Sequence, residues 1–291
     1  MRSVSTTLHW RLGPTLAAVQ PKWARWRPTL HYLFQTEAHV YALAISASVL
    51  LSFFPFFIVM VSFCRNVLHW QAAEKAIYLA IGDHFAGEPG QFLARNLQSW
   101  FRINKIGITS MLLLLFTANG IFEPLEVALN RAWGVGENRS YLKNQLVSVG
   151  LIFACGSLVL LSFMLTALNT QWMSDVFGGN SGIAVWLQLL TFKLAALPIS
   201  ILALFLVYWL LPNRQIEPRR VAPVAVFVGL ALEGLKYVNL FAWPLLEAKL
   251  HREYSIFEHS VTIVLWSFVA SLIVLAGAHW TARHEKPDPL S

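Results

Sequence analysis

Six long apolar segments divide the chain, and they constrain its fold more than any other feature. Each is close to the roughly 20 residues that an α-helix needs to cross the hydrocarbon core of a bilayer. Lipid offers the backbone no hydrogen-bond partners, so segments of this kind cross a membrane as helices. They lie at about 42–64, 106–128, 146–168, 185–211, 221–243 and 259–281. The sequence therefore predicts an all-α, polytopic membrane protein with six transmembrane helices.

The composition excludes an ordinary soluble protein. Hydrophobic residues make up 56% of the 291 residues and charged residues only 13%, whereas soluble domains carry roughly 25% charge. In a soluble chain the net charge of +7 would suggest nucleic acid as a partner. Here the basic residues lie mostly beside the apolar segments, where they orient the chain and meet anionic headgroups. We therefore expect membrane lipids as partners, and no nucleic acid.

The distribution of Lys and Arg predicts that both termini are cytoplasmic. With the N-terminus inside, the cytoplasmic parts hold 13 of these residues and the outer parts hold 7, and the outer connection 169–184 holds none. Positive charge favours the cytoplasmic side. The chain then divides into a cytoplasmic arm (1–40), a transmembrane domain (41–282) and a short cytoplasmic tail (283–291).

Two segments outside the spans are expected to form helices. The arm mixes basic residues with tryptophan, which suits the headgroup layer, and we expect an interfacial helix at about 29–39. For residues 1–20, a disordered tail is an equal alternative. The outer loop, 65–105, is long for a connection, and 72–85 and 92–101 have helical patterns. We expect this partly helical loop to cap the outer face, with a re-entrant or interfacial hairpin as the alternative.

A group of ionisable residues lies inside the predicted membrane region. Glu233 and Lys236 are spaced i, i+3 in the fifth span, so they share a helix face and can pair, and Asn239 follows three residues later. Lys193 in the fourth span lies at a similar depth. Charges in the membrane interior need a partner or a wet cavity. One interpretation is a polar cavity for an anionic headgroup or an ion; the other is a buried pair that fixes helix packing.

A second polar group lies in the cytoplasmic half of the second span and just beyond its end. Asn119, Glu123, Glu126 and Asn130 are spaced i, i+4, i+7 and i+11, which places them on one helical stripe that a lipid-facing helix would not need. With Arg131 and Arg214 they are candidates for a cytoplasmic gate or headgroup site. The alternative is an ion-pair network at headgroup level, with Arg131, Arg214, Arg219 and Arg220 as the cationic partners.

The sequence contains no pattern that indicates catalysis. The nine histidines form no HxH, HxxxH or HExxH pattern, and Gly-rich phosphate loops and GxSxG are missing. Cys64 and Cys155 lie in or beside apolar spans without CxxC spacing, which favours free buried thiols. We therefore expect no cofactor, no metal site and no enzymatic activity. A membrane-bound hydrolase or nuclease is the remote alternative.

Four short motifs resemble a known family. SFFPFFIVMVSF (52–63), ALNRAWGV (128–135), LPNR (211–214) and LEGLKY (232–237) occur in the order found in the YihY/virulence factor BrkB family of inner-membrane proteins, and the resemblance covers about residues 35–282. One departure is YSIFEHS (254–260), where that family often has a Gly-rich, Tyr-Gly-Ser-like run.

The resemblance implies six transmembrane helices and a location in the bacterial inner membrane. Family members were once labelled ribonuclease BN, but this chain lacks the histidine-rich metal motif of such a nuclease. Other members are linked to serum resistance and to the movement of lipid or lipopolysaccharide precursors.

Taken together, these observations lead us to expect a transporter-like protein that handles an anionic amphiphile, such as an anionic lipid, through a polar intramembrane cavity. A membrane scaffold or envelope assembly factor with purely structural charges is the alternative. A homo-oligomer is compatible with either function.

Overall fold

The computed structural model describes residues 27–84, 88–103, 108–135, 140–177 and 182–283, and all regular elements within these ranges are helical. In chain order they are α1 (Arg27–Leu33), α2 (Thr36–Ser62), a π-helical turn (Phe63–Val67), α3 (Gln71–His84), α4 (Glu88–Ile103), α5 (Ile108–Ala132), α6 (Tyr141–Phe177), α7 (Gly182–Leu210), α8 (Pro218–Tyr254), a 3-10 turn (Ser255–Phe257) and α9 (Glu258–Arg283).

Four helices among the described residues are long and apolar enough to cross a membrane. They cover Thr36–Val67, Leu142–Leu165, Pro218–Tyr254 and Glu258–Ala282, and Ala196–Leu210 is a shorter apolar helix. The all-helical membrane fold is therefore confirmed. The count of six spans and the cytoplasmic location of both termini stay predictions, although a helix is present at all six expected segments.

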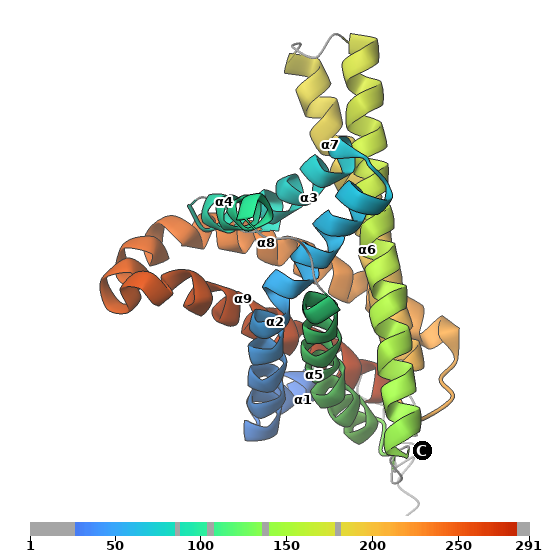
Figure 1. The fold of residues 1–291 in the computed structure, drawn as a ribbon. Coiled ribbons are helices and arrows are strands. Elements are labelled where there is room, and N and C mark those ends of the chain that lie inside the picture. The colour runs from blue at the N-terminus through green and yellow to red at the C-terminus, as the bar shows by residue number, and fades with distance from the viewer. Residues whose placement is uncertain (1–26, 85–87, 104–107, 136–139, 178–181, 284–291) are drawn as a thin grey trace, which may run out of the picture.

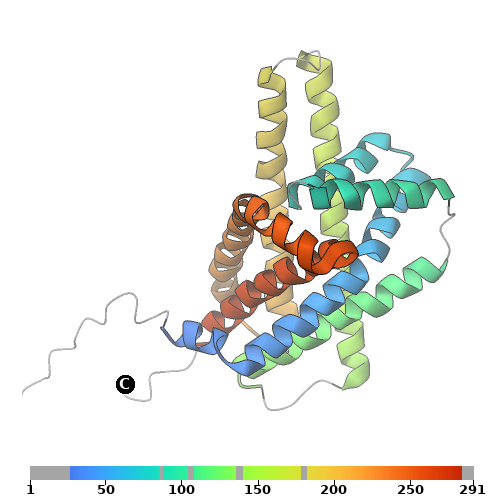
Figure 2. The same cartoon turned by 90° about the vertical axis from the view of Figure 1, so that its left-hand side faces the viewer.

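The helices do not form one parallel bundle (Figure 1). α6 is the longest upright element, with 37 residues, and with α7 it forms a hairpin that rises beyond α3 and α4 in both views (Figures 1 and 2). α8 and α9 form a second hairpin that crosses the first at a steep angle. α2 packs against α5 and α9 and so connects the two halves of the fold.

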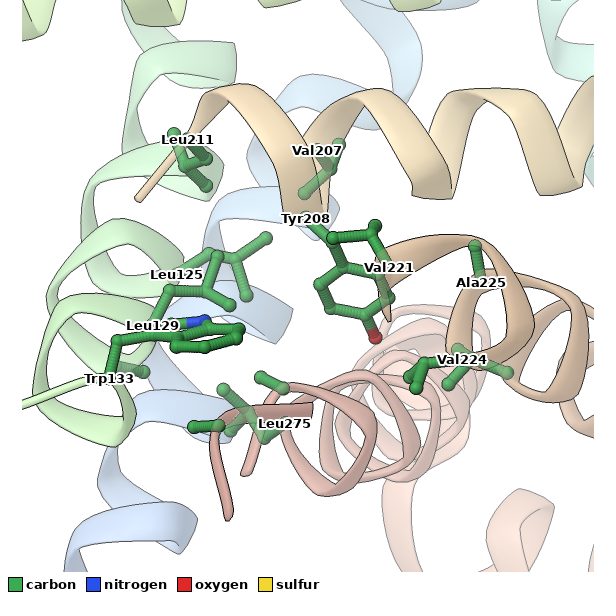
Figure 3. Close-up of a cluster of buried hydrophobic side chains, with 14 of the residues drawn as sticks. Leu125, Leu129, Trp133, Val207, Tyr208, Leu211, Val221, Val224, Ala225 and Leu275 are labelled. Carbon is green, nitrogen blue, oxygen red and sulfur yellow. The ribbon is translucent and has the colours of Figure 1, made fainter. Parts of the chain in front are cut away.

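One hydrophobic core joins α5, α7, α8 and α9 (Figure 3). Leu129 of α5 and Trp133, which directly follows this helix, pack with Leu211, Val221 and other side chains of this cluster, and all four are almost fully buried. Tyr208 of α7 lies fully within this core, and its hydroxyl donates a 2.7 Å hydrogen bond to the backbone oxygen of Val274 in α9. That bond satisfies the one polar atom of the side chain, as a buried tyrosine requires.

A glycine lets α8 and α9 approach closely within this core. A Cβ atom placed on Gly277 would overlap the Val228 side chain and would lie 2.8 Å from the Tyr208 hydroxyl. No larger residue fits there without moving one of the helices or the tyrosine.

A second core fastens the 65–105 loop to α2 and α6, and the two helices expected in this loop are confirmed. Leu93 and Leu97 of α4 are buried, whereas Arg95 and Asn96 on the opposite face are exposed. This is the two-faced pattern that the sequence of 92–101 predicts. The loop is therefore a packed part of the fold.

Polar contacts also tie α3 to the end of α2. The Arg65 guanidinium makes two hydrogen bonds to the Glu74 carboxylate, at 2.7 and 3.3 Å, and lies 5.3 Å from the centre of the Phe101 ring. The Tyr78 hydroxyl donates to the same carboxylate at 3.3 Å. Burial, together with the negative charge of Glu74, raises the pKa of Tyr78 to about 12, so this phenol stays a hydrogen-bond donor at physiological pH.

The helix expected before the first span is confirmed in a shorter form. α1 covers Arg27–Leu33, and its Tyr32 ring stacks on His279 of α9 with the centroids 4.5 Å apart. Residues 1–26 of the arm lie outside the described residues. At the other end of the fold, α8 does not stop at Pro244 as the fifth predicted span does; it continues to Tyr254. Trp243 and Leu250, on either side of this proline, are buried, and their packing holds the helix together.

Candidate functional site

A cavity of about 510 Å³ lies between six helices, five of them at predicted membrane spans and one, α3, in the 65–105 loop. α2, α3, α6, α7, α8 and α9 all contribute to its wall. Most lining side chains are apolar; the polar ones and the tryptophan are Ser162, Ser200, Glu233, Lys236, Asn239, Trp266 and Ser267. Its size and its mainly apolar wall with few polar groups are typical of sites that hold small molecules or single lipid tails.

The Glu233–Lys236 pair forms the charged part of the cavity wall. The Lys236 ammonium lies 2.8 Å from a Glu233 carboxylate oxygen, and the side chains are 20% and 23% exposed. The pair follows from the i, i+3 spacing on α8. Most of its surface is therefore shielded, yet both groups reach the cavity.

Two further polar side chains come to this wall from different helices. Asn239, one turn beyond Lys236 on α8, is 5% exposed. Trp266 of α9 lines the same cavity, and its indole Nε1–H is buried without a hydrogen-bond acceptor among the described residues. Trp266 was not predicted as a cavity residue. A tryptophan within an apolar span can face either lipid or a cavity, and the sequence pattern does not distinguish the two.

Lys193 belongs to α7, three and four residues before Ala196 and Leu197, which both line the cavity. Residues at these spacings share a helix face, so the Lys193 backbone lies on the cavity face of α7, one turn further along. Its side chain is outside the described residues, and an approach of Lys193 to Glu233 stays a prediction.

The aromatic residues of the SFFPFFIVMVSF motif form the part of the cavity wall that α2 contributes. Phe53, Phe56 and Phe57 line the cavity, and the Phe57 ring lies 4.9 Å from Phe53 and 5.2 Å from Phe56, centroid to centroid. Packed rings of this kind give a rigid apolar surface. The motif therefore has a clear place in the structure.

The structure places the members of the polar stripe at 119–130 in different surroundings. Glu126 and Asn130 are each 3% exposed, whereas Glu123 is exposed and the Asn119 side chain lies outside the described residues. Asn130 donates to a Glu126 carboxylate oxygen at 3.3 Å and accepts a 2.7 Å hydrogen bond from the backbone N–H of Asn213. The α7–α8 connection therefore covers the last turns of α5 at Asn130.

Two of the family-like motifs, ALNRAWGV and LPNR, contact each other at this point. The helix end at Gly134, which has a φ of +63°, places the Trp133 carbonyl where the Arg214 guanidinium donates to it at 3.3 Å. A left-handed glycine after the last helical turn is a common way to end a helix. The motifs thus fix the end of α5 against the α7–α8 connection.

Arg131 has a different partner from those expected. Its guanidinium lies 2.6 Å from the Glu37 carboxylate at the start of α2, with both side chains exposed. This contact joins α5 to α2. The anticipated pairing of Glu123 and Glu126 with Arg214, Arg219 and Arg220 stays a prediction. Whether this cluster acts as a gate stays a prediction.

Several curated proteins are similar in sequence. A UPF0761 membrane protein of Acinetobacter baylyi is 25% identical over 80% of this chain and 55% of its own length. A UPF0761 membrane protein of Nitrosospira multiformis is 26% identical over 63% of this chain and 42% of its length. The chain thus spans about half the length of these two relatives. The putative ribonuclease-like protein YfkH of Bacillus subtilis is 23% identical over 82% of this chain and 88% of its length.

No solved structure matches the fold. The sequence, however, matches the family model described as virulence factor BrkB over residues 32–289. This range contains the cavity, the α5 end and all four family-like motifs. The chain belongs to the virulence factor BrkB family of membrane proteins.

Proposed function

We propose that the protein is a transporter-like protein of the bacterial inner membrane that binds an amphiphile with an anionic group in the cavity between α2 and α8. The observation that carries the proposal is the combination of an apolar wall with one charge pair in a cavity of about 510 Å³. Apolar chains would lie against the phenylalanines of α2, and the anionic group would reach Lys236.

The position of the charge pair supports this function. A helix-packing pair needs no access to an open space, because its role is complete once the two groups meet. Glu233 and Lys236 instead retain about a fifth of their side-chain surface and line the cavity. Ionisable groups that face an intramembrane cavity commonly mark substrate or ion pathways.

The α7–α8 connection and the first turn of α8 supply positive charge at the predicted cytoplasmic side. Arg214 in the connection, and Arg219 and Arg220 at the start of α8, are exposed. In the proposal this surface meets headgroups at the cytoplasmic side, with Asn119, Glu123, Glu126, Asn130 and Arg131 as the remaining members of the candidate gate.

The proposal can be tested by a substitution on α7 that places a larger side chain in the cavity. Ala203 lines the cavity, whereas its neighbour Leu202 is 44% exposed and is not among the lining residues. We expect Ala203→Phe to reduce the lipid retained in native mass spectrometry, and the movement of a fluorescent phospholipid across vesicles, by at least about fivefold because the ring occupies the ligand's space. Leu202→Phe is the matched control and should behave as wild type.

Equal lipid retention and equal lipid movement in wild type, Ala203→Phe and Leu202→Phe would contradict the proposal. A scaffold whose charges are structural predicts this result. It also predicts that Glu233→Leu together with Lys236→Met leaves folding and function intact, because a buried pair can be replaced by apolar residues of similar volume at little cost.

A further inference from the structure

The cavity wall passes directly into the hydrophobic core on two helices that lead toward the inner end of the fold. On α7, Leu204 lines the cavity, and Tyr208, one turn further along, is buried in the core. On α9, Ala270 lines the cavity, and Val274 follows one turn later. The backbone oxygen of Val274 accepts the 2.7 Å hydrogen bond from the Tyr208 hydroxyl. Tyr208 therefore joins α7 to α9 one turn below the cavity.

A third helix meets them at the same level. On α8, which leads away from the α7–α8 connection, Val228 directly precedes the lining residue Gly229. The Val228 side chain occupies the space where a Cβ atom of Gly277 on α9 would lie, and that atom would be 2.8 Å from the Tyr208 hydroxyl. Figure 3 shows the Tyr208 ring between α7, α8 and α9. Tyr208, Val228 and Gly277 together are named the Tyr208 layer here.

The Tyr208 layer closes the cavity on the side of the α7–α8 connection. Tyr208 is 2% exposed and Val228 is 1% exposed, and an apolar constriction of this kind excludes water and polar headgroups. Since α9 contributes a glycine at this level, the closure depends on one tyrosine ring and one valine. Among the described residues, the Tyr208 hydroxyl makes one hydrogen bond, so a single polar contact of this side chain has to break when α7 and α9 separate.

We propose that the Tyr208 layer is the gate between the cavity and the side of the membrane that the α7–α8 connection faces. Separation of α7 from α9 breaks the bond to Val274 and draws the ring out of the layer, and the cavity then opens to that side. This inference rests on the proposed function, because a transporter opens its site to each side in turn, whereas a scaffold needs only the closed layer. The structure is the state in which this gate is closed.

The experiment measures how fast a membrane-impermeant thiol reagent reaches a cysteine in the cavity of protein reconstituted in vesicles. With Cys64 and Cys155 replaced by alanine, Ser267→Cys on α9 is the reporter, because Ser267 lines the cavity. Gln215→Cys, in the α7–α8 connection, identifies the side of the membrane from which the reagent is added. From this side we expect the closed layer to keep the labelling of the reporter slow.

Tyr208→Phe keeps the ring in the layer and removes the hydroxyl that bonds to α9. We expect it to speed labelling from this side about two- to tenfold, the range of one hydrogen bond. Trp209→Phe is the matched control. It removes the 3.1 Å hydrogen bond from the neighbouring indole to the backbone oxygen of Ile216, but Trp209 is 38% exposed and lies outside the layer, so the labelling rate should not change.

Val228→Ala is a second variant, which removes bulk from the layer and leaves the hydrogen bond in place, and it should also speed labelling. Unchanged rates in Tyr208→Phe and Val228→Ala would overturn the gate. Reagent added from the opposite side does not cross the layer, so all variants should then label at the same rate. Faster labelling from both sides would show a general loosening of the fold and would also overturn the assignment.

The gate and the proposed function can fail separately. Loss of lipid in Ala203→Phe, together with labelling that is insensitive to Tyr208→Phe and Val228→Ala, would overturn the gate and leave lipid binding in the cavity in place. Equal lipid retention in wild type and Ala203→Phe would contradict the proposed function, and with it the role of the Tyr208 layer in transport.

Discussion

At the scale of single residues, Ser255 has an unfavourable backbone conformation. It ends α8 with a φ of 48° and a ψ of −119°, a region that side chains with a Cβ rarely adopt. It falls in YSIFEHS (254–260), and a glycine at this position would make the same turn without strain.

We expect Ser255→Gly to increase the free energy of unfolding by about 1 kcal/mol, because glycine adopts this conformation without steric cost. The measurement is thermal unfolding in detergent. Ser260→Gly is the matched control in the first turn of α9, and it should reduce stability by about 0.5–1 kcal/mol. A lower stability for Ser255→Gly would show that its side chain makes a contact that outweighs the strain.

The buried Asn130 gives a second prediction at this scale. It accepts a hydrogen bond from the Asn213 backbone and donates to Glu126, so Asn130→Ala should reduce the free energy of unfolding by about 1–3 kcal/mol. Arg131→Ala removes an exposed pair with Glu37 and should cost less than about 1 kcal/mol. Equal losses measured by thermal unfolding would contradict this ranking.

At the residue scale, the sequence is sufficient to predict contacts that depend on the spacing of residues within one helix. The Glu233–Lys236 contact lies within one helix, so the i, i+3 spacing is sufficient to predict that the two side chains can meet. Trp266 and Glu37 were not identified, because their roles depend on which helices lie beside them.

At the scale of elements, the crossing of α8 and α9 depends on Gly277. We expect Gly277→Ala to reduce stability by about 1–2 kcal/mol, because the added Cβ would overlap Val228 and crowd the Tyr208 hydroxyl. Gly150→Ala on α6 is the matched control: no heavy atom lies within 4 Å of its added Cβ, and alanine favours a helix over glycine by about 1 kcal/mol. Thermal unfolding of the two variants should therefore shift in opposite directions.

Elements with a clear periodicity could be predicted, and α4 is the best example, since its alternating buried and exposed faces match the sequence pattern. The end of α8 could not be predicted. Proline usually interrupts a helix, but the burial of Trp243 and Leu250 is a tertiary effect that the local sequence does not express.

At the scale of the whole molecule, the orientation in the membrane is still to be tested. With Cys64 and Cys155 replaced by alanine, we expect a membrane-impermeant thiol reagent added to intact cells to label Lys75→Cys on α3. It should not label Gln215→Cys in the α7–α8 connection until the membrane is permeabilised. Both positions are exposed in the structure. The opposite labelling pattern would reverse the predicted orientation.

The steep crossing of the two hairpins in Figure 1 was beyond prediction from sequence. Hydropathy reports which segments enter lipid, but the angles between helices depend on side-chain packing and on close contacts such as that at Gly277. The sequence thus predicts the helices well. It predicts the cavity only as a cluster of polar residues, because the cavity forms only when six helices come together.

The length of α6 has a mechanical consequence. Its 37 residues make a rod of about 55 Å, almost twice the roughly 30 Å thickness of the hydrocarbon core. Phe163 places the cavity wall near the middle of this rod. A rotation of about 5° pivoted there would move each end by only about 2 Å, but by about 5 Å if it were pivoted at one end. If α6 rotates as a rigid rod, the displacement of its ends therefore depends on where the neighbouring helices hold it.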